Sequence, residues 1–240
     1  MNALRAEWTK FRTAPGNLWL LTAVVVVTVA GGAATIASVR TGDLAEYSLT
    51  GVQLGQAVVA IIAALTVGGE YRTDMIHTTL TATPRRITVP AAKAVVVAGV
   101  VAVSGAVSVA VSLLVGREIR PGLALGGEAV LRAAYGSVLY LILIGLLTVG
   151  VAFAVRDTAA AIGVVLGLLY VFTVVAQMVP DPEVRTDLKR IAPMSAGLAI
   201  QATRDVADQP VAPWDGLGVL ALWAAGSLLA GGVSFRLRDA

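Results

Sequence analysis

The chain has 240 residues, of which 57% are hydrophobic and 14% charged, and its formal net charge is +3. Soluble domains carry about 25% charged residues, so this composition predicts a membrane protein. The chain has no cysteine and one histidine, His77. These counts exclude disulfides, thiolate metal sites and cysteine nucleophiles, and leave too few imidazoles for a histidine metal site.

Residues 3–14, with the sequence ALRAEWTKFRTA, predict an amphipathic helix that lies in the plane of the lipid headgroups. Leu4, Trp8 and Phe11 fall at i, i+4 and i+7 on one apolar stripe, and the basic residues lie off that stripe. The Pro-Gly pair at 15–16 then ends the helix. A disordered, positively charged N-terminus is the alternative interpretation.

Long apolar runs predict six membrane-spanning helices, because a bilayer core needs about 20 apolar residues per helix. They lie at roughly 17–39, 49–69, 91–116, 130–155, 158–179 and 214–235. The fold class that we expect is therefore an all-α membrane protein, with residues 1–16 forming the amphipathic helix and 17–240 a single transmembrane domain. The first run exceeds the 7–15 apolar residues of a typical signal peptide and follows a segment that contains Glu7, which argues against cleavage.

The distribution of Lys and Arg sets the orientation that we expect. If both termini are cytoplasmic, the short inner connections carry more basic than acidic residues, whereas acidic residues outnumber basic ones on the outer side. We therefore predict a multi-pass protein with both termini in the cytoplasm and residues 67–90 on the same side.

The polar segment 67–90 predicts a short helix between the second and third spans. Thr73 or Asp74 can cap its N-terminus, and Thr83-Pro84 ends it. One face of this helix carries Met75, Ile76, Thr79 and Leu80. An exposed apolar face of this kind would need a partner protein. The alternative is a helix that lies on the membrane without a partner. After the helix, the basic residues are expected to meet the lipid headgroups, namely Arg85, Arg86 and Lys93.

The long connection at about 180–213 predicts two short helices on the outer side. Pro193 would separate them, and Ser195 would cap the second. A solvated loop is the alternative. Within the spans, Ser104, Ser108 and Ser112 form a stripe that favours close helix packing over pore lining, and Gly163 and Gly167 have the spacing of a close helix contact.

Several kinds of chemistry have no candidate residues in this sequence. The central parts of the predicted spans contain no acidic residue and no lysine, which argues against proton relays and ion-coupled transport. The chain also lacks the GxxxxGK[ST] phosphate-binding loop and any pair of catalytic groups within the membrane. We therefore expect no cofactor, no metal and no enzymatic activity in this chain.

The segment GGEYRTDMIHTTLTATPRR resembles the cytoplasmic loop between spans two and three of ABC-2 type transporter permeases, especially the small actinobacterial kind. The N-terminal LRAEWTKFRT and the outer-loop APMSAGLAIQ are also similar to that family, so the resemblance extends along the whole chain. Asp74 and His77 depart from it, because a glycine and a basic residue are frequent at these positions.

The resemblance implies a permease subunit of an exporter in the bacterial plasma membrane. It would pair with a second copy of itself or a related permease, and with a separate ATP-binding subunit that carries ATP and Mg. The resemblance also implies that the chain contacts membrane lipid and binds no nucleic acid. The residues implied in coupling to the ATPase are Glu70, Tyr71, Arg72, Asp74, Met75, Ile76, His77, Thr79, Leu80, Pro84, Arg85 and Arg86. Those implied in the substrate path, between spans two and five, are Gln53, Gln56, Val59, Ile62, Thr66, Thr173 and Gln177.

The alternative function is a six-span membrane anchor, or a partner subunit that transports nothing. Such a protein would lack catalytic groups just as a permease subunit does. An intramembrane enzyme is disfavoured for that same lack of catalytic residues.

Overall fold

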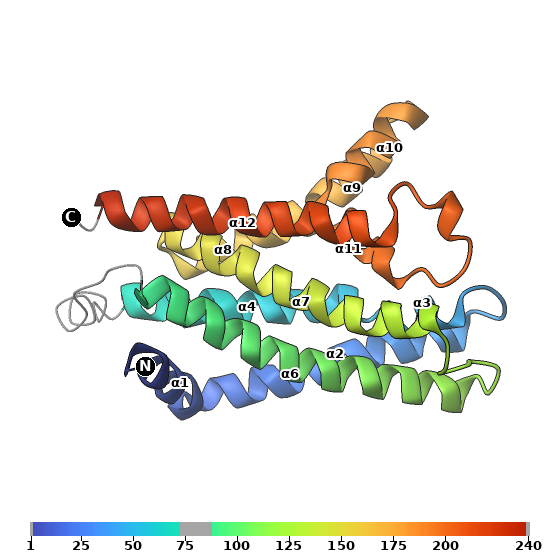
Figure 1. Cartoon of the computed structure of the whole chain (residues 1–240), viewed down its shortest axis with the longest axis horizontal. Coiled ribbons are helices and arrows are strands. Elements are labelled where there is room, and N and C mark those ends of the chain that lie inside the picture. Colours follow the sequence, from blue (N-terminus) through green and yellow to red (C-terminus); the bar gives the residue numbers. More distant parts are fainter. Residues whose placement is uncertain (1, 73–87, 239–240) are drawn as a thin grey trace.

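The computed structural model describes residues 2–72 and 88–238, and within these ranges the chain is all helical, with no strand. Six spans within these ranges are long and apolar enough to cross a membrane, which confirms the predicted all-α class with six candidate spans; Figure 1 shows how they are arranged. The elements are α1 (Asn2–Thr13), α2 (Pro15–Ser38), α3 (Leu44–Leu49), α4 (Val52–Arg72), α6 (Thr88–Ile119), α7 (Glu128–Val155), α8 (Thr158–Leu166), the π-helical segment η1 (Gly167–Val171), α9 (Phe172–Met178), α10 (Pro182–Ile191), α11 (Pro193–Leu198), the 3-10 turns η2 (Ala199–Gln201) and η3 (Val206–Asp208), and α12 (Pro213–Arg238).

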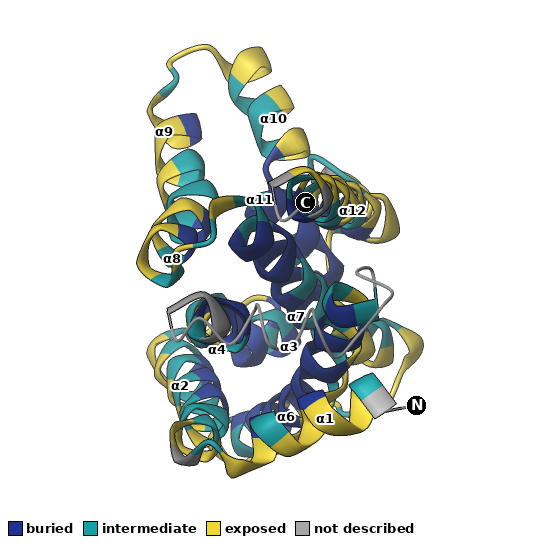
Figure 2. Cartoon of the chain, turned by 90° about the vertical axis from the view of Figure 1, so that its left-hand side faces the viewer, coloured by how far each residue is buried: buried dark blue, intermediate teal, exposed yellow. Residues whose placement is uncertain are grey.

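The six spans lie side by side, so the chain has two distinct ends. The N-terminus, the C-terminus, and the ends of the described chain at residues 72 and 88 lie at one end, which we call the terminal face (Figure 1). The opposite face carries α3, the connection between α6 and α7, and the connection before α12. Figure 2 looks along the spans from the terminal face and shows α1 lying crosswise to them.

The second span begins earlier than the sequence predicts and contains a break. It starts at Leu44 as α3, turns at Thr50 and Gly51, and continues as α4. The break coincides with a close crossing of α2, because a Cβ at Gly51 would overlap the carbonyl oxygen of Thr28, and one at Gly32 would overlap that of Ser48. Glycine at these positions lets the two backbones touch.

Helix α7 is the centre of the bundle and packs against α4, α6 and α12. Its inner side is buried, including Tyr140, Leu141 and Ile144. The predicted serine stripe on α6 is buried as well, at Ser104, Ser108 and Ser112, which confirms packing over pore lining within one subunit. By contrast, a Cβ at Gly163 or Gly167 would meet nothing within 4 Å, so that glycine pair makes no close helix contact inside the described subunit.

The connection between spans five and six contains the two short helices that the sequence predicts, α10 and α11. The predicted cap at Ser195 is wrong. Helix α11 begins at Pro193 with Ala192 as its N-cap, because proline is favoured at the first helical position, where its missing N–H costs nothing.

Candidate functional site

A cavity of about 320 Å3 lies at the opposite face, where spans two and five meet the connection before α12. Three residues of the predicted substrate path line it together: Gln53 of α4, and Thr173 and Gln177 of α9. The remaining wall includes Glu46, Lys189 and Ser195, so the cavity combines amides, hydroxyls and one charge of each sign with apolar side chains.

Two tyrosines hold the polar groups around this cavity in place. The hydroxyl of Tyr140 donates to Oε1 of the fully buried Gln56. The amide of Gln56 contacts Sδ of Met194 at 3.3 Å, and Met194 itself lines the cavity. The hydroxyl of Tyr170 donates to the carbonyl of Gln53. Buried polar groups need such partners because an unsatisfied one costs about 1–3 kcal/mol.

A π-helical segment interrupts span five beside the cavity. The N–H of Phe172 donates to the carbonyl of Gly167, five residues earlier, so the segment Gly167–Val171 separates α8 from α9. The sequence predicts one continuous helix here. Single-turn π segments are frequently found at functional sites, and this one contains Tyr170, which bonds across to span two.

The other predicted path residues lie elsewhere. Val59 and Ile62 are completely buried in the core of the subunit. Thr66 lies further along α4 toward the terminal face, where its hydroxyl donates to the carbonyl of Ile62 at 2.7 Å. The structure therefore brings Gln53, Thr173 and Gln177 together on the cavity wall and leaves Val59, Ile62 and Thr66 off it. The buried Gln56 contacts the wall through Met194.

The predicted coupling residues lie mostly outside the described residues. The backbone of α4 extends through Glu70, Tyr71 and Arg72, and the chain is described again from Thr88, where α6 begins. Both points lie at the terminal face (Figure 1). The residues outside the described ranges are Asp74, Met75, Ile76, His77, Thr79, Leu80, Pro84, Arg85 and Arg86.

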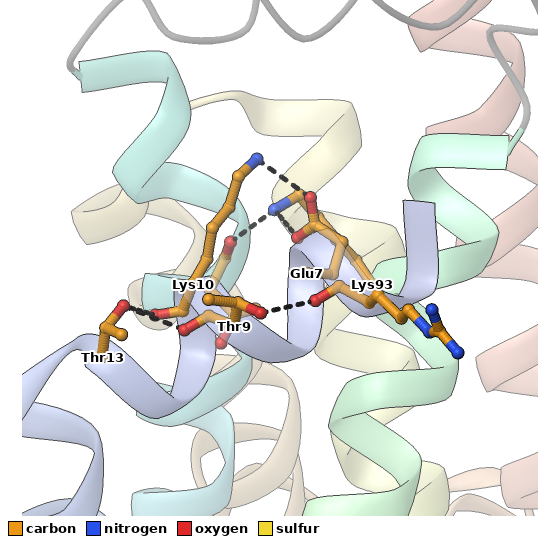
Figure 3. Close-up of polar contacts among 7 residues, drawn as sticks. Glu7, Thr9, Lys10, Thr13 and Lys93 are labelled. Carbon is orange, nitrogen blue, oxygen red and sulfur yellow. Dashed lines mark hydrogen bonds and ion pairs between the residues drawn. The ribbon is translucent and has the colours of Figure 1, made fainter. Parts of the chain in front are cut away.

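A buried ion pair joins α1 to the spans at the terminal face. The ammonium of Lys93 lies 2.7 Å from Oε2 of Glu7 and donates to the carbonyl of Thr66 at 3.1 Å. Lys10 contacts the other carboxylate oxygen of Glu7 at 3.0 Å. Figure 3 shows Glu7 between these two lysines. The expectation that Lys93 meets the headgroups is wrong, because Lys93 is only 1% exposed and Glu7 neutralises its charge.

The position of Glu7 on α1 is the sequence feature that could have predicted this contact. Glu7 stands three residues after Leu4 and four before Phe11, so it lies on the same side of the helix as the apolar stripe. In the structure Phe11 and Glu7 are buried, whereas Leu4 and Trp8 stay about half exposed. An acidic residue within an apolar stripe was the available signal for a buried basic partner.

Asp43 ties the connection before α12 to the start of span two. Its carboxylate accepts the hydroxyl of Thr203 at 2.6 Å and the N–H of Arg204 at 2.8 Å, and it caps α3 through the N–H of Glu46 at 3.1 Å. Burial raises the pKa of Asp43, but these hydrogen bonds stabilise the carboxylate and together lower its pKa below the usual 3.8.

The fold defines a multi-pass, all-helical membrane protein with six candidate spans. A family described as ABC-2 family transporter protein matches residues 3–174, from α1 into α9. The match covers more than half of the chain, and the chain therefore belongs to the ABC-2 transporter family. This confirms the resemblance over residues 3–174, which include the N-terminal segment and the segment between spans two and three; the outer-loop segment at 192–201 lies outside the match. No curated protein matches the sequence.

Proposed function

We propose that this chain is the membrane-spanning subunit of an ATP-driven exporter and that it uses ATP through a separate subunit. Membership of the ABC-2 transporter family carries this proposal. The absence of a phosphate-binding loop from the sequence supports the second part, because the energy of ATP then has to come from another chain.

The partner ATPase, with its ATP and Mg, would dock at the terminal face on the segment between α4 and α6. Both termini and this segment would face the cytoplasm of a bacterium, as the positive-inside rule favours. Helix α1 would lie in the headgroup plane there. Its ion pair to Lys93 supports this arrangement, because it fixes α1 against the first turns of α6 and the end of α4.

The subunit would work as a dimer, with a second copy or a related permease covering span five. Span five supports this because one side of it is an exposed apolar surface: Val164, Val171, Val174, Val175 and Met178. Gly163 and Gly167 belong to the same span, and a Cβ at either would meet nothing within 4 Å. Substrate would pass between spans two and five, by way of the cavity lined by Gln53, Thr173 and Gln177.

Transport would follow from two states of the dimer. ATP binding by the partner subunits would favour one state through the segments at the terminal face, and hydrolysis would restore the other. The hydrogen bond from Tyr170 to Gln53 joins spans two and five at the cavity, so it is a contact whose geometry a change between the states would alter.

The decisive experiment is co-purification of the chain with an ATPase, followed by measurement of ATP hydrolysis. Deletion of residues 74–81, or Ile76→Asp with Leu80→Asp, should abolish the association while the chain still inserts and folds. Val184→Asp with Ile191→Asp is the matched control for the double variant, since it adds the same two charges at exposed apolar residues of α10 and should leave the association intact.

Three outcomes would separate the proposals. Normal ATPase association after the deletion would refute the docking site. An associated ATPase that no transported compound stimulates would favour the alternative of a partner subunit that transports nothing. Absence of any associated ATPase would favour a simple membrane anchor.

A further inference from the structure

An apolar groove of about 600 Å3 lies between α1, α2 and α6, on the outside of the bundle. Aromatic and aliphatic side chains form most of its wall, among them Trp8, Phe11, Leu18 and Val103. Trp8 and Phe11 stack on each other with their ring centroids 6.5 Å apart. Of the described residues that line the groove, only Arg12 is charged.

The groove opens toward the surroundings of the protein. Leu18 is 62% exposed and Val103 67% exposed, and both belong to spans. Along α6 the groove runs from Gly99 to Val107, which corresponds to about 12 Å of helix. It lies away from span five, because α1 packs on α2 and α6 whereas α8 packs on α4 and α7; Figure 2 shows α1 and α6 far from α9.

The charge at the end of the groove identifies the class of ligand. Glu7, the acidic residue of α1, is already paired with Lys93 and Lys10. Arg12 forms no ion pair with any described residue, so within the described part of the chain no carboxylate is paired with its charge where α1 meets the first span. A ligand that complements the site has a long apolar chain and an anionic head.

We propose that this groove binds one acyl chain of an anionic phospholipid from the surrounding bilayer, with the headgroup at Arg12. The acyl chain lies along α6 beneath Trp8 and Phe11, and the phosphate pairs with the guanidinium. The lipid thereby fills the angle between α1 and the spans and holds α1 against α2 and α6. This inference requires only that the chain spans a membrane and is independent of any ATPase partner.

The headgroup half of the proposal is tested by native mass spectrometry of the full chain purified from bilayers of phosphatidylglycerol and phosphatidylcholine. The wild-type protein should retain one phosphatidylglycerol in preference to phosphatidylcholine. Arg12→Gln should reduce that preference roughly fivefold, which corresponds to one cation near an anionic surface. Arg5→Gln removes an equal charge from an exposed position of α1 outside the groove and should leave the preference unchanged.

The acyl-chain half is tested by filling the groove. Gly99 lines the groove, and a Cβ there meets nothing within 4 Å, so Gly99→Leu extends an apolar side chain from an unhindered Cβ and should abolish retention of either lipid. Gly226→Leu is the control at an equally open glycine of α12 and should keep it.

Several results would overturn the proposal. Equal losses in Arg12→Gln and Arg5→Gln would show attraction by net charge alone. Retention of lipid in Gly99→Leu would show that no acyl chain occupies the groove. A change in oligomeric state caused by Gly99→Leu alone would show that a second copy of the chain covers it.

Discussion

Lys93 and Glu7 stand 86 residues apart in the sequence, yet their charged groups lie 2.7 Å apart. Their side chains are only 2% and 5% exposed, respectively. Because Lys93 also donates to the carbonyl of Thr66, a single ammonium group joins α1, the end of α4 and the start of α6. Two of these elements, α4 and α6, flank the proposed docking segment in the sequence.

The ion pair predicts a large effect of removing one partner. Lys93→Met would leave the buried carboxylate of Glu7 with only Lys10 beside it among the residues shown to contact it. Breaking a buried pair from one side costs about 3–5 kcal/mol, so the melting temperature of the detergent-purified protein should fall strongly. The double variant Glu7→Leu with Lys93→Met should recover most of that loss, because neither charge is then buried alone.

Lys10→Met provides the control for this prediction. Lys10 contacts the same carboxylate, but its side chain is 35% exposed, and pairs of this kind contribute about 1 kcal/mol or less. Equal decreases in melting temperature for Lys10→Met and Lys93→Met would contradict the importance of the buried pair.

The buried amide of Gln56 predicts a second effect, at the cavity. Tyr140→Phe removes the hydroxyl that donates to Oε1 of Gln56. An unsatisfied buried acceptor costs about 1–3 kcal/mol, so thermal unfolding should shift to lower temperature. Tyr135→Phe is the matched control, because Tyr135 is about half exposed and its stacking on Trp214 needs only the ring. A loss as large in Tyr135→Phe would refute this account.

The sequence predicts the spans well because each is a long apolar run whose ends coincide with prolines, glycines and charges. It predicts the lateral contacts poorly, because they join residues that are distant in the chain. Nothing local marks Gln56 as the acceptor of Tyr140, 84 residues away, or Glu7 as the partner of Lys93. The π segment also has no signature, since Gly167–Val171 is as apolar as the rest of its span. The prediction that Gln53, Thr173 and Gln177 share one site comes from the family resemblance and not from their spacing in the sequence.

Asp43 predicts a specific dependence of stability on pH. Its pKa is lower in the folded chain than the usual 3.8, so the carboxylate stabilises the fold fully above that value. The contribution is lost as the pH falls through the folded-state pKa. Asp43→Asn should reduce the free energy of unfolding near pH 6 by about 2 kcal/mol, which lowers the melting temperature. The difference in melting temperature between wild type and variant should shrink as the pH is lowered below 3.8.

Asp157→Asn serves as the control for Asp43. The exposed Asp157 caps α8 through one N–H, that of Ala160, at 2.7 Å, and asparagine caps helices about as well as aspartate. Its effect near pH 6 should therefore be small. If the difference in melting temperature between wild type and Asp43→Asn stayed constant from pH 6 to below pH 3.8, the stabilisation could not come from the charge of the Asp43 carboxylate.

The crossing of α2 and α4 predicts that a single methyl group is too large at Gly51. A Cβ there would overlap the carbonyl oxygen of Thr28 and the backbone nitrogen of Gly32, and backbone atoms cannot move aside as a flexible side chain can. Gly51→Ala should therefore cost at least the 1–3 kcal/mol typical of overpacking. Gly218→Ala, at an open position of α12, should instead gain up to about 1 kcal/mol, because alanine favours helix. Melting temperatures of the two variants should move in opposite directions, and a neutral Gly51→Ala would show that α2 and α4 separate readily at this crossing.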